Sequence, residues 1–314
     1  MKKIKIIFAG TGKFSSVHLN ELILKKFKIS TIITKIDKKI GRGKKIKFSE
    51  VKKTAINNHL PFIQTNSLNS EEYYTILKKK KPDIMIIVSF GLIIPEKIIN
   101  IFPLGCINIH TSLLPKFRGP SPIQSAILLG KKKTGITIIQ INNKLDTGDI
   151  LYKKSINIEK KETYDTLKKK LSILGKKSLI KFLKNIFLKK YIPIKQIENQ
   201  ATYTKKIYKK DGLINWNQNA SEIEKKIRAF NSWPGTFFFI KNIMIKIWKA
   251  NIIKSIKKNI PGKIIQANKN GISISTKNHL INITELQFAG KKKNKVYNII
   301  HSYKKLFEIG QIII

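Results

Sequence analysis

A chain of 314 residues with 42% hydrophobic side chains is long enough to build two domains with buried cores. It has no run of about 18 uncharged apolar residues, which argues against a membrane span, and the short apolar run after Lys2 and Lys3 predicts a core strand, not a signal peptide. The single cysteine, Cys106, excludes an internal disulfide and Cys-rich metal sites and fits a reducing cytoplasm. The formal net charge of +45 indicates either a nucleic-acid partner or a drift of the amino-acid composition toward lysine, isoleucine and asparagine.

Apolar strands alternate with helix-like segments from the N-terminus to about residue 150. Serines suited to cap a helix begin two of these segments, Ser49 and Ser70. The predicted strands are 4–10, 29–34, 83–90, 106–110 and 135–142, and the predicted helices are 15–27, 49–58, 70–81, 121–129 and 163–187. This alternation predicts a doubly wound, Rossmann-like α/β domain with a mostly parallel sheet.

The turn after the first strand, FAGTGKFSS, is similar to a phosphate-binding loop. It lacks the spacing of a Walker A loop and the third glycine of a dinucleotide-binding turn. We therefore interpret it as a tight strand-to-helix turn, with nucleotide binding as the alternative.

The periodicity fades over residues 189–208, which we interpret as a linker between a first domain, 1–188, and a C-terminal domain, 209–314. After one helix over 221–230, the C-terminal domain shows short alternating runs with turn signals at Lys241-Asn242 and Asn270-Gly271. This pattern predicts a small antiparallel OB-like β-barrel.

Two polar side chains interrupt the apolar strand CINIH. Asn108 and His110 are two residues apart, so they project from the same face of a strand. The loop that follows places them at the carboxyl end of a parallel strand, where open α/β sheets bind ligands. A buried histidine with an asparagine partner is the alternative, but it explains a polar pair followed by a loop poorly.

Asp146 lies just beyond strand 135–142, from where it can reach the ends of neighbouring strands. A carboxylate beside an imidazole orients the ring and favours its charged form. An amide donor for an oxyanion, together with a His–Asp pair that manages the proton, favours acyl-type transfer. Cys106 lies deeper in its strand, so we expect direct transfer without a covalent intermediate. An aspartate-led turn without chemistry is the alternative.

Only three of the 63 basic residues are arginines, namely Arg42, Arg118 and Arg228. In a chain that uses lysine almost everywhere, an arginine indicates a place that needs a planar, permanently charged, bidentate fork. This contrast directs attention to the loops GRGKK and KFRGP.

These motifs resemble the formyltransferases that use 10-formyltetrahydrofolate. The signature comprises Asn108, His110, SLLP (112–115), Arg118-Gly119 and LDTGD (145–149). Within that superfamily the resemblance is closest to the methionyl-tRNA formyltransferases, which are bacterial, cytoplasmic enzymes of translation initiation. It runs nearly end to end, through FAGT, GRGKK, SFGLIIP, GCINIHTSLLP, PIQ, TGITI, LDTGDILY, IRAFNSWPG and IWKA.

The resemblance implies formyl transfer from 10-formyltetrahydrofolate, a co-substrate, to the amino group of initiator methionyl-tRNA, without a metal. It implies that Asn108 stabilises the oxyanion, that His110 carries positive charge or shuttles a proton, and that Asp146 orients His110 and deprotonates the amine. The implied folate contacts are Ser89, Phe90, Gly91, Leu92, Ser112, Leu113, Leu114 and Pro115, and the implied tRNA contacts are Arg42, Gly43, Lys44 and Lys45. The barrel would bind tRNA, no membrane partner is implied, and a monomer is expected.

Three alternatives remain open. A glycinamide ribonucleotide formyltransferase would lack GRGKK and the region after Lys189, whereas a sugar-nucleotide formyltransferase can carry an added domain and is disfavoured mainly by the basic charge. A non-enzymatic RNA-binding module is disfavoured by the intact set of Asn108, His110 and Asp146.

Overall fold

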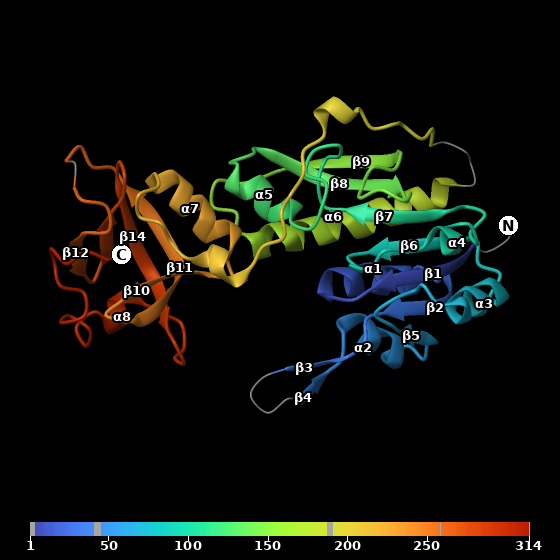
Figure 1. The fold of residues 1–314 in the computed structure, drawn as a ribbon, viewed down its shortest axis with the longest axis horizontal. Helices are drawn as coiled ribbons and strands as arrows, with labels where there is room; N and C mark the ends of the chain where they lie inside the picture. The colour runs from blue at the N-terminus through green and yellow to red at the C-terminus, as the bar shows by residue number, and fades with distance from the viewer. Residues whose placement is uncertain (1–3, 41–44, 187–190, 258, 314) are drawn as a thin grey trace. The chain divides into compact units, whose positions relative to one another are not determined.

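The computed structural model describes residues 4–40, 45–186, 191–257 and 259–313 (Figure 1). The backbone divides into two compact units. The first comprises Met1–Pro122, Lys133–Ile156 and Lys168–Thr204, and the second comprises Ile123–Lys132, Asn157–Leu167 and Lys205–Ile314. Within the described ranges, no helix combines the length and the apolar character needed to cross a membrane.

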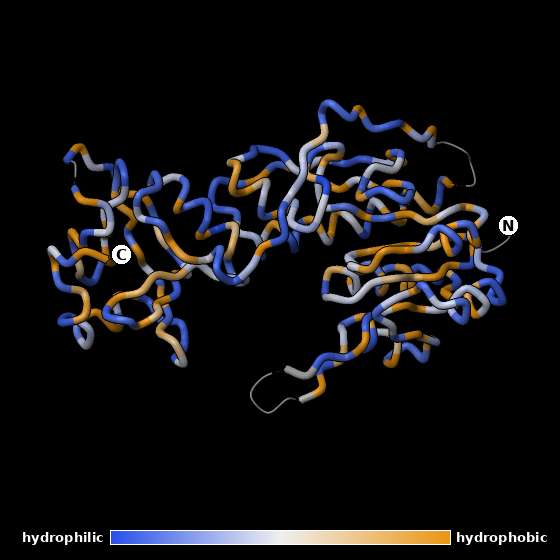
Figure 2. Tube along the Cα trace, in the orientation of Figure 1, coloured by the Kyte–Doolittle hydropathy of each residue, from blue (hydrophilic) through white to orange (hydrophobic). Residues whose placement is uncertain are grey.

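A seven-stranded sheet forms the first unit, in the order β5-β2-β1-β6-β7-β8-β9 (Figure 1). The strands are β1 (Lys5–Gly10), β2 (Lys28–Thr34), β5 (Phe62–Gln64), β6 (Ile84–Val88), β7 (Cys106–His110), β8 (Lys133–Gln140) and β9 (Ile150–Asn157). The pairs among β5, β2, β1, β6 and β7 are parallel, which confirms the predicted mostly parallel sheet. Hydrophobic residues concentrate on the central strands β1 and β6, which are almost entirely buried (Figure 2).

Short elements escaped prediction because they carry too few residues to show a period. These are β5, a small hairpin of β3 (Lys38–Ile40) and β4 (Lys45–Lys47), and helix α4 (Glu96–Ile99). Strand β9 was also missed, since its outer half is exposed and lysine-rich. The other helices are α1 (Lys13–Leu24), α2 (Glu50–Asn57), α3 (Glu71–Lys79), α5 (Pro122–Leu128), α6 (Tyr164–Asn185), α7 (Ala220–Ala229) and α8 (Val296–Ile299).

Helix α1 begins two residues before the predicted start at Ser15. The Ser15 hydroxyl donates to the carbonyl of Val88 on β6, so it is not available as a cap, and Gly12 takes the N-cap position in an extended conformation. A side chain at Gly10 would overlap with Ser15 and with the Val88 carbonyl oxygen. The glycine-rich turn thus lets α1 pack close to the sheet, in line with its interpretation as a strand-to-helix turn.

The two predicted serine caps behave differently. Ser49 Oγ accepts a hydrogen bond of 3.0 Å from the Lys52 backbone N–H, which confirms the cap of α2. Ser70 occupies the N-cap position of α3 but its side chain makes no cap hydrogen bond, so the acidic residues of the first turn, Glu71 and Glu72, are left to stabilise this helix end.

His18 of α1 is completely buried. Its Nδ1 lies 2.8 Å from the Phe14 carbonyl oxygen, so this nitrogen carries the proton and donates it. Nε2 is then an acceptor without a partner among the described residues, and it lies against Gly175 of α6, where a methyl group would overlap with it. Burial lowers the pKa of His18 to about 4, so the ring is neutral at pH 7.

Stability should fall in mild acid because of His18. An unfolded histidine takes up its proton near pH 6.5 and the folded one only near pH 4, so the unfolded state binds more protons between these values. This group alone should lower the free energy of unfolding by about 3 kcal/mol from pH 7 to pH 4, and its contribution should level off below pH 4. Urea titrations of the wild type, His18→Leu and the exposed control His301→Leu measure the effect. Equal pH slopes in all three would contradict a buried neutral His18.

An antiparallel sheet forms the core of the second unit, in the order β10-β11-β14-β13-β12, with β15 paired to β14. The strands are β10 (Thr236–Ile240), β11 (Ile243–Ile253), β12 (Ile264–Asn268), β13 (Gly271–Ser275), β14 (Leu280–Phe288) and β15 (Asn294–Lys295). Lys241 and Asn242 both have positive φ and join β10 to β11, which confirms this predicted turn. Closure of the sheet into an OB-like barrel stays a prediction.

Helix α7 begins at Ala220, one residue before the predicted start, and Asn219 and Glu222 form a capping box at its N-terminal end. Its apolar side contributes Ile223 and Ile227 to the core of the second unit. Arg228 forms a bidentate pair with Glu224 one turn earlier, with N···O distances of 2.7 and 2.9 Å.

Candidate active site

Asn108 and His110 lie on β7 and both face Asp146, as their spacing predicts. Asn108 Nδ2 donates a long hydrogen bond of 3.5 Å to Asp146 Oδ1, and His110 Nδ1 lies 3.6 Å from Asp146 Oδ2. The side chains of His110 and Asp146 are only 7% and 11% exposed. Two side chains of β7 and one of the loop between β8 and β9 therefore meet in a partly dehydrated place, where electrostatic interactions are stronger than in water.

The far side of the His110 ring is fixed by the backbone. Nε2 lies 2.9 Å from the carbonyl oxygen of Phe117, which can only accept, so Nε2 carries a proton. In the neutral ring Nδ1 is then unprotonated and faces the Asp146 carboxylate, which makes Nδ1 the nitrogen that can gain and lose a proton. The Phe117 carbonyl, rather than Asp146 alone, sets the orientation of the imidazole.

Asp146 reaches this place from the loop between β8 and β9. Strand β8 runs antiparallel to β7, with Ile107 opposite Gln140 and His110 opposite Thr137, so the end of β8 lies next to the start of β7. Asp146 therefore follows the end of β8 that lies beside the start of β7, away from His110. The loop between β8 and β9 folds back, and Asp146 adopts a left-handed φ of 53° that brings its carboxylate to the histidine.

The Asp146 carboxylate has a further partner in the backbone of the loop after β7. The Gly119 N–H donates to Oδ2 over 2.8 Å. Gly119 has a φ of 106°, and a side chain there would overlap with Thr204, so this position suits glycine only. The Arg-Gly pair of the sequence motif thus positions the carboxylate through its glycine N–H.

Cys106 does not offer a nucleophile to this site. Its side chain is fully buried in an apolar cluster with Met85, Ile87 and Phe102, and burial raises the pKa of the thiol far above its usual value. A thiolate is the reactive form of cysteine, so a neutral buried thiol cannot attack a carbonyl. This geometry supports the expectation of direct transfer.

The predicted folate residues fall into buried and accessible groups. Phe90, Ser112 and Leu114 are buried, and Ser112 Oγ already donates to the Lys116 carbonyl over 2.6 Å. Ser89 and Gly91 are exposed and both have positive φ. The remaining three residues, Leu92, Leu113 and Pro115, are half-buried. Contacts to a ligand would therefore come from backbone groups and from the half-buried apolar side chains.

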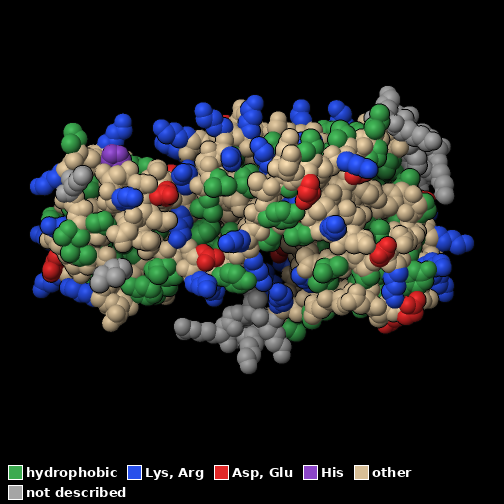
Figure 3. All heavy atoms as spheres, turned by 45° about the horizontal axis from the view of Figure 1, so that its top comes forward, with side chains coloured by type: hydrophobic (Ala, Val, Ile, Leu, Met, Phe, Trp, Pro, Cys, Tyr) green, Lys and Arg blue, Asp and Glu red, His purple; other side chains and the backbone are tan. Residues whose placement is uncertain are grey.

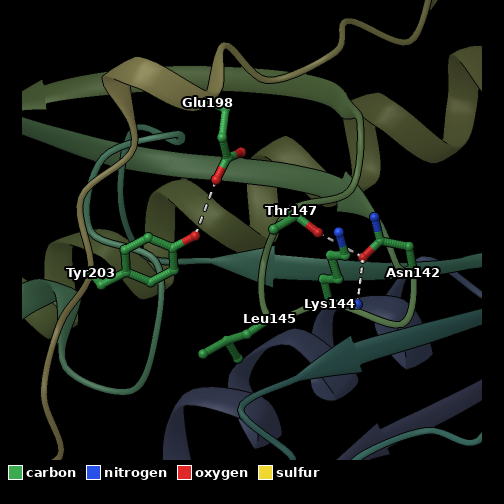
Figure 4. Close-up of a pocket in the computed structure, with 6 residues that line it drawn as sticks. All are labelled: Asn142, Lys144, Leu145, Thr147, Glu198 and Tyr203. Atoms are coloured by element: carbon green, nitrogen blue, oxygen red, sulfur yellow. Dashed lines mark hydrogen bonds between the residues drawn. The ribbon is translucent and has the colours of Figure 1, made fainter.

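A cavity of about 480 Å³ opens beside the Asp146 loop (Figure 4). Its lining residues are Asn142, Lys144, Leu145, Thr147, Glu198 and Tyr203. Asn142 Oδ1 accepts hydrogen bonds from the Lys144 N–H and the Thr147 hydroxyl, which stiffens the loop on both sides of Asp146. The exposed side chains of Leu145 and Tyr203 give the cavity an apolar surface beside Lys144 and Glu198.

The predicted tRNA contacts Arg42, Gly43 and Lys44 lie outside the described residues, and Lys45 begins β4. The described part of the chain contains no group of three or more His, Cys, Asp or Glu side chains that could hold a metal ion.

Residues 194–204, within the segment predicted as a linker, form part of the site's surroundings and were not foreseen. Ile194 pairs with Ile150 at the start of β9, and Arg118 exchanges backbone hydrogen bonds with Thr202 and Thr204. The Arg118 side chain is fully buried and binds Glu198 in bidentate fashion over 2.8 and 2.9 Å. In the sequence, only Arg118 itself pointed to this contact. A guanidinium group favours a bidentate carboxylate partner, and the chain has only 18 acidic residues that could provide one.

Comparison with known proteins gives a consistent result along most of the chain. Residues 2–183 match the family model described as formyl transferase, and residues 206–304 match the model described as formyl transferase, C-terminal domain. A methionyl-tRNA formyltransferase of Buchnera aphidicola subsp. Acyrthosiphon pisum (strain Tuc7) is 48% identical over 314 residues, with 100% of both chains covered.

Two solved structures share the fold. HypX from Aquifex aeolicus in complex with tetrahydrofolic acid has a TM-score of 0.66 at 15% identity and covers 100% of this chain, which spans 51% of HypX. An N-formyltransferase from Helicobacter canadensis, in complex with folinic acid and dTDP-3-aminofucose, has a TM-score of 0.67 at 23% identity and covers 89% of this chain and 98% of its own.

Proposed function

This chain belongs to the methionyl-tRNA formyltransferase family, and we propose that it transfers the formyl group of 10-formyltetrahydrofolate to the α-amino group of initiator methionyl-tRNA. The observation that carries this proposal is the meeting of Asn108, His110 and Asp146 in one partly dehydrated place. An amide donor beside an imidazole–carboxylate pair provides what an acyl transfer between two nitrogens needs, namely a partner for an oxyanion and a route for one proton.

Asn108 stabilises the negative charge that develops on the formyl oxygen. When the amine nitrogen attacks the formyl carbon, a C–N bond forms and the carbonyl electron pair moves onto oxygen. One N–H of the Asn108 amide faces Asp146 Oδ1, and the other is left to donate to that oxygen. A protonated His110 adds positive charge nearby.

The Asp146–His110 pair moves one proton from the amine to the leaving group. The Asp146 carboxylate takes a proton from the attacking nitrogen, and His110 Nδ1 gives a proton to N10 of the folate as the old C–N bond breaks. Passage of the proton from Asp146 Oδ2 to Nδ1, 3.6 Å away, restores both groups. One C–N bond forms and one C–N bond breaks. Together with the formyl group's transfer, one proton passes from the amine to N10 of the folate.

The remaining contacts are proposed on the same basis. We assign the folate donor to Ser89–Leu92 and Ser112–Pro115 and the acceptor stem to residues 42–45, as the resemblance implies. The C-terminal domain, 209–314, supplies further tRNA contacts. HypX and the Helicobacter canadensis enzyme are bound to folate derivatives on a similar fold, which supports a folate donor here.

An acceptor comparison tests the assignment. The protein is incubated with 10-formyltetrahydrofolate and, in separate reactions, with methionyl-tRNA, glycinamide ribonucleotide or a dTDP-amino sugar, and the products are identified by mass. We expect formylation of methionyl-tRNA alone. Formylation of either small molecule in preference to methionyl-tRNA would contradict the proposal.

The tRNA affinity should depend steeply on salt. Lysine and arginine side chains outnumber acidic ones on the face shown in Figure 3, in keeping with the net charge of +45. Release of counterions from the tRNA should weaken binding about tenfold for every two phosphate contacts between 50 and 200 mM salt. Filter binding at several salt concentrations measures the slope, and a flat dependence would show that the lysine excess is compositional drift.

A further inference from the structure

Gln196 lies close to the candidate active site although no motif includes it. It belongs to the segment 191–204, in which most side chains are exposed, yet its own side chain is half-buried. Its Nε2 donates two hydrogen bonds of 2.8 Å, to the backbone carbonyls of Asp146 and Gly148. Its Oε1 accepts from Arg118 Nε and Nη2 over 3.2 and 3.1 Å. All four hydrogen-bonding positions of the amide are therefore used.

The orientation of this amide follows from chemistry alone. Arginine only donates, so the oxygen of Gln196 must face Arg118 and the nitrogen must face the two carbonyls, which only accept. The flipped amide would place two donors against Arg118 and an acceptor against two carbonyl oxygens. Arg118 thus dictates that Gln196 presents two N–H groups to the Asp146 loop.

Arg118 is itself held firmly. Besides its two bonds to Gln196, it binds both oxygens of Glu198 and the hydroxyl of Tyr203, so all five of its N–H groups have partners. A fully buried guanidinium with every donor satisfied has one stable arrangement, because any rotation would strand charged donors away from water. It forms a rigid anchor for the Gln196 amide.

The Asp146 loop needs such support. A non-glycine residue at φ 53° sits in a backbone region that costs on the order of 1–3 kcal/mol and persists only where its surroundings hold it. At Gly148 a side chain would overlap with the Gln140 carbonyl, so the turn is also tight. The two carbonyls that Gln196 binds flank Thr147 and so fix the backbone on both sides of the turn.

We propose that Gln196 is a positioning residue for the reaction: it transmits the fixed orientation of Arg118 to the backbone of Asp146 and so holds the carboxylate beside Asn108 and His110. This inference rests on the proposed role of Asp146. Gln196 touches no reacting atom in this account, and its effect on turnover passes entirely through Asp146.

Gln196→Glu is the sharpest test, because it keeps the size and the oxygen that faces Arg118 but puts a second oxygen against two carbonyls. Gln200→Glu is the matched control, since Gln200 is exposed on the same segment and the charge change is identical. We expect Gln196→Glu to lower kcat by about 30- to 100-fold with the KM values for both substrates within about twofold of wild type. Gln200→Glu should behave as wild type.

A double-mutant cycle separates positioning from a general structural role. In the Asp146→Ala background, Gln196→Glu should cause no further loss, because the group it positions is gone. An equal fold-loss in both backgrounds would overturn the inference, and so would wild-type kcat in the single variant.

A spectroscopic readout distinguishes this outcome from failure of the proposed function. In the ligand-free protein, the NMR signals of the His110 ring should shift in Gln196→Glu and stay unchanged in Gln200→Glu. If the wild-type protein did not formylate methionyl-tRNA, the proposed function would be contradicted. The NMR measurement would still show whether Gln196 holds Asp146, because it needs no substrate. Unchanged His110 signals in Gln196→Glu would overturn the positioning role by itself.

Discussion

His110→Ala should lower kcat/KM for formyl transfer about a thousandfold, the size typical of losing a group that both transfers a proton and stabilises charge. The geometry gives the reason. Nδ1 is the only ring nitrogen free to exchange a proton, since Nε2 is committed to the Phe117 carbonyl, and it faces the Asp146 carboxylate 3.6 Å away. Single-turnover measurements with saturating folate and methionyl-tRNA give the rate of the chemical step.

The variant should still bind tRNA with an affinity close to that of wild type, because His110 is buried and contributes nothing to the basic surface. His301→Ala serves as the control, since His301 is exposed and lies far along the chain in the second unit. A His110 variant with near-normal single-turnover rate would remove His110 from the reaction. A parallel loss of rate and of tRNA affinity would indicate misfolding instead of lost chemistry.

Arg118→Met should lower kcat about a hundredfold, the scale of a displacement of about 1 Å in a catalytic group. Methionine fills much of the same volume but cannot donate, so Gln196 loses the partner that fixes its amide and the Asp146 turn loses its anchor. The free energy of unfolding should fall by about 2 kcal/mol, because Glu198 and Tyr203 are exposed enough to bind water instead. The effect on activity should therefore exceed the effect on stability.

Arg228→Met provides the comparison, because Arg228 also makes a bidentate pair but lies on α7 in the second unit. It should lower the free energy of unfolding by a similar amount, because its pair with Glu224 is also largely shielded from water, and leave the chemical step unchanged. If Arg118→Met kept wild-type kcat while Gln196→Glu did not, Arg118 would not be the anchor of the Gln196 amide.

Part of the candidate site could be predicted from the sequence because two of its three residues, Asn108 and His110, are close together along one strand. Asn108 and His110 share a face through the two-residue period of β7, and this relation holds whatever the rest of the fold does. The sheet was equally accessible to prediction, since β1 and β6 are nearly unbroken apolar runs. The residue type also predicted the cap hydrogen bond of Ser49, although the same reasoning failed for the Ser70 side chain.

Contacts between distant segments were not predictable in the same way. The antiparallel direction of β8 depends on its pairing with β7, and its apolar pattern would be the same for a parallel strand. Gln196 lies 50 residues from Asp146 in a stretch without periodicity, so no local pattern links the two. Arg118 was a hint of a bidentate partner, but a single sequence does not identify which carboxylate that partner is.

The central claim is that one formyl group passes directly from folate to the amine of methionyl-tRNA at Asn108, His110 and Asp146. The most direct test mixes enzyme, 10-formyltetrahydrofolate and methionyl-tRNA in a rapid-quench experiment and measures N-formylmethionyl-tRNA and tetrahydrofolate at each time point. The account predicts that both products rise together, one for one, and that no tetrahydrofolate forms without methionyl-tRNA. A burst of tetrahydrofolate with enzyme alone would reveal a formyl-enzyme and contradict direct transfer.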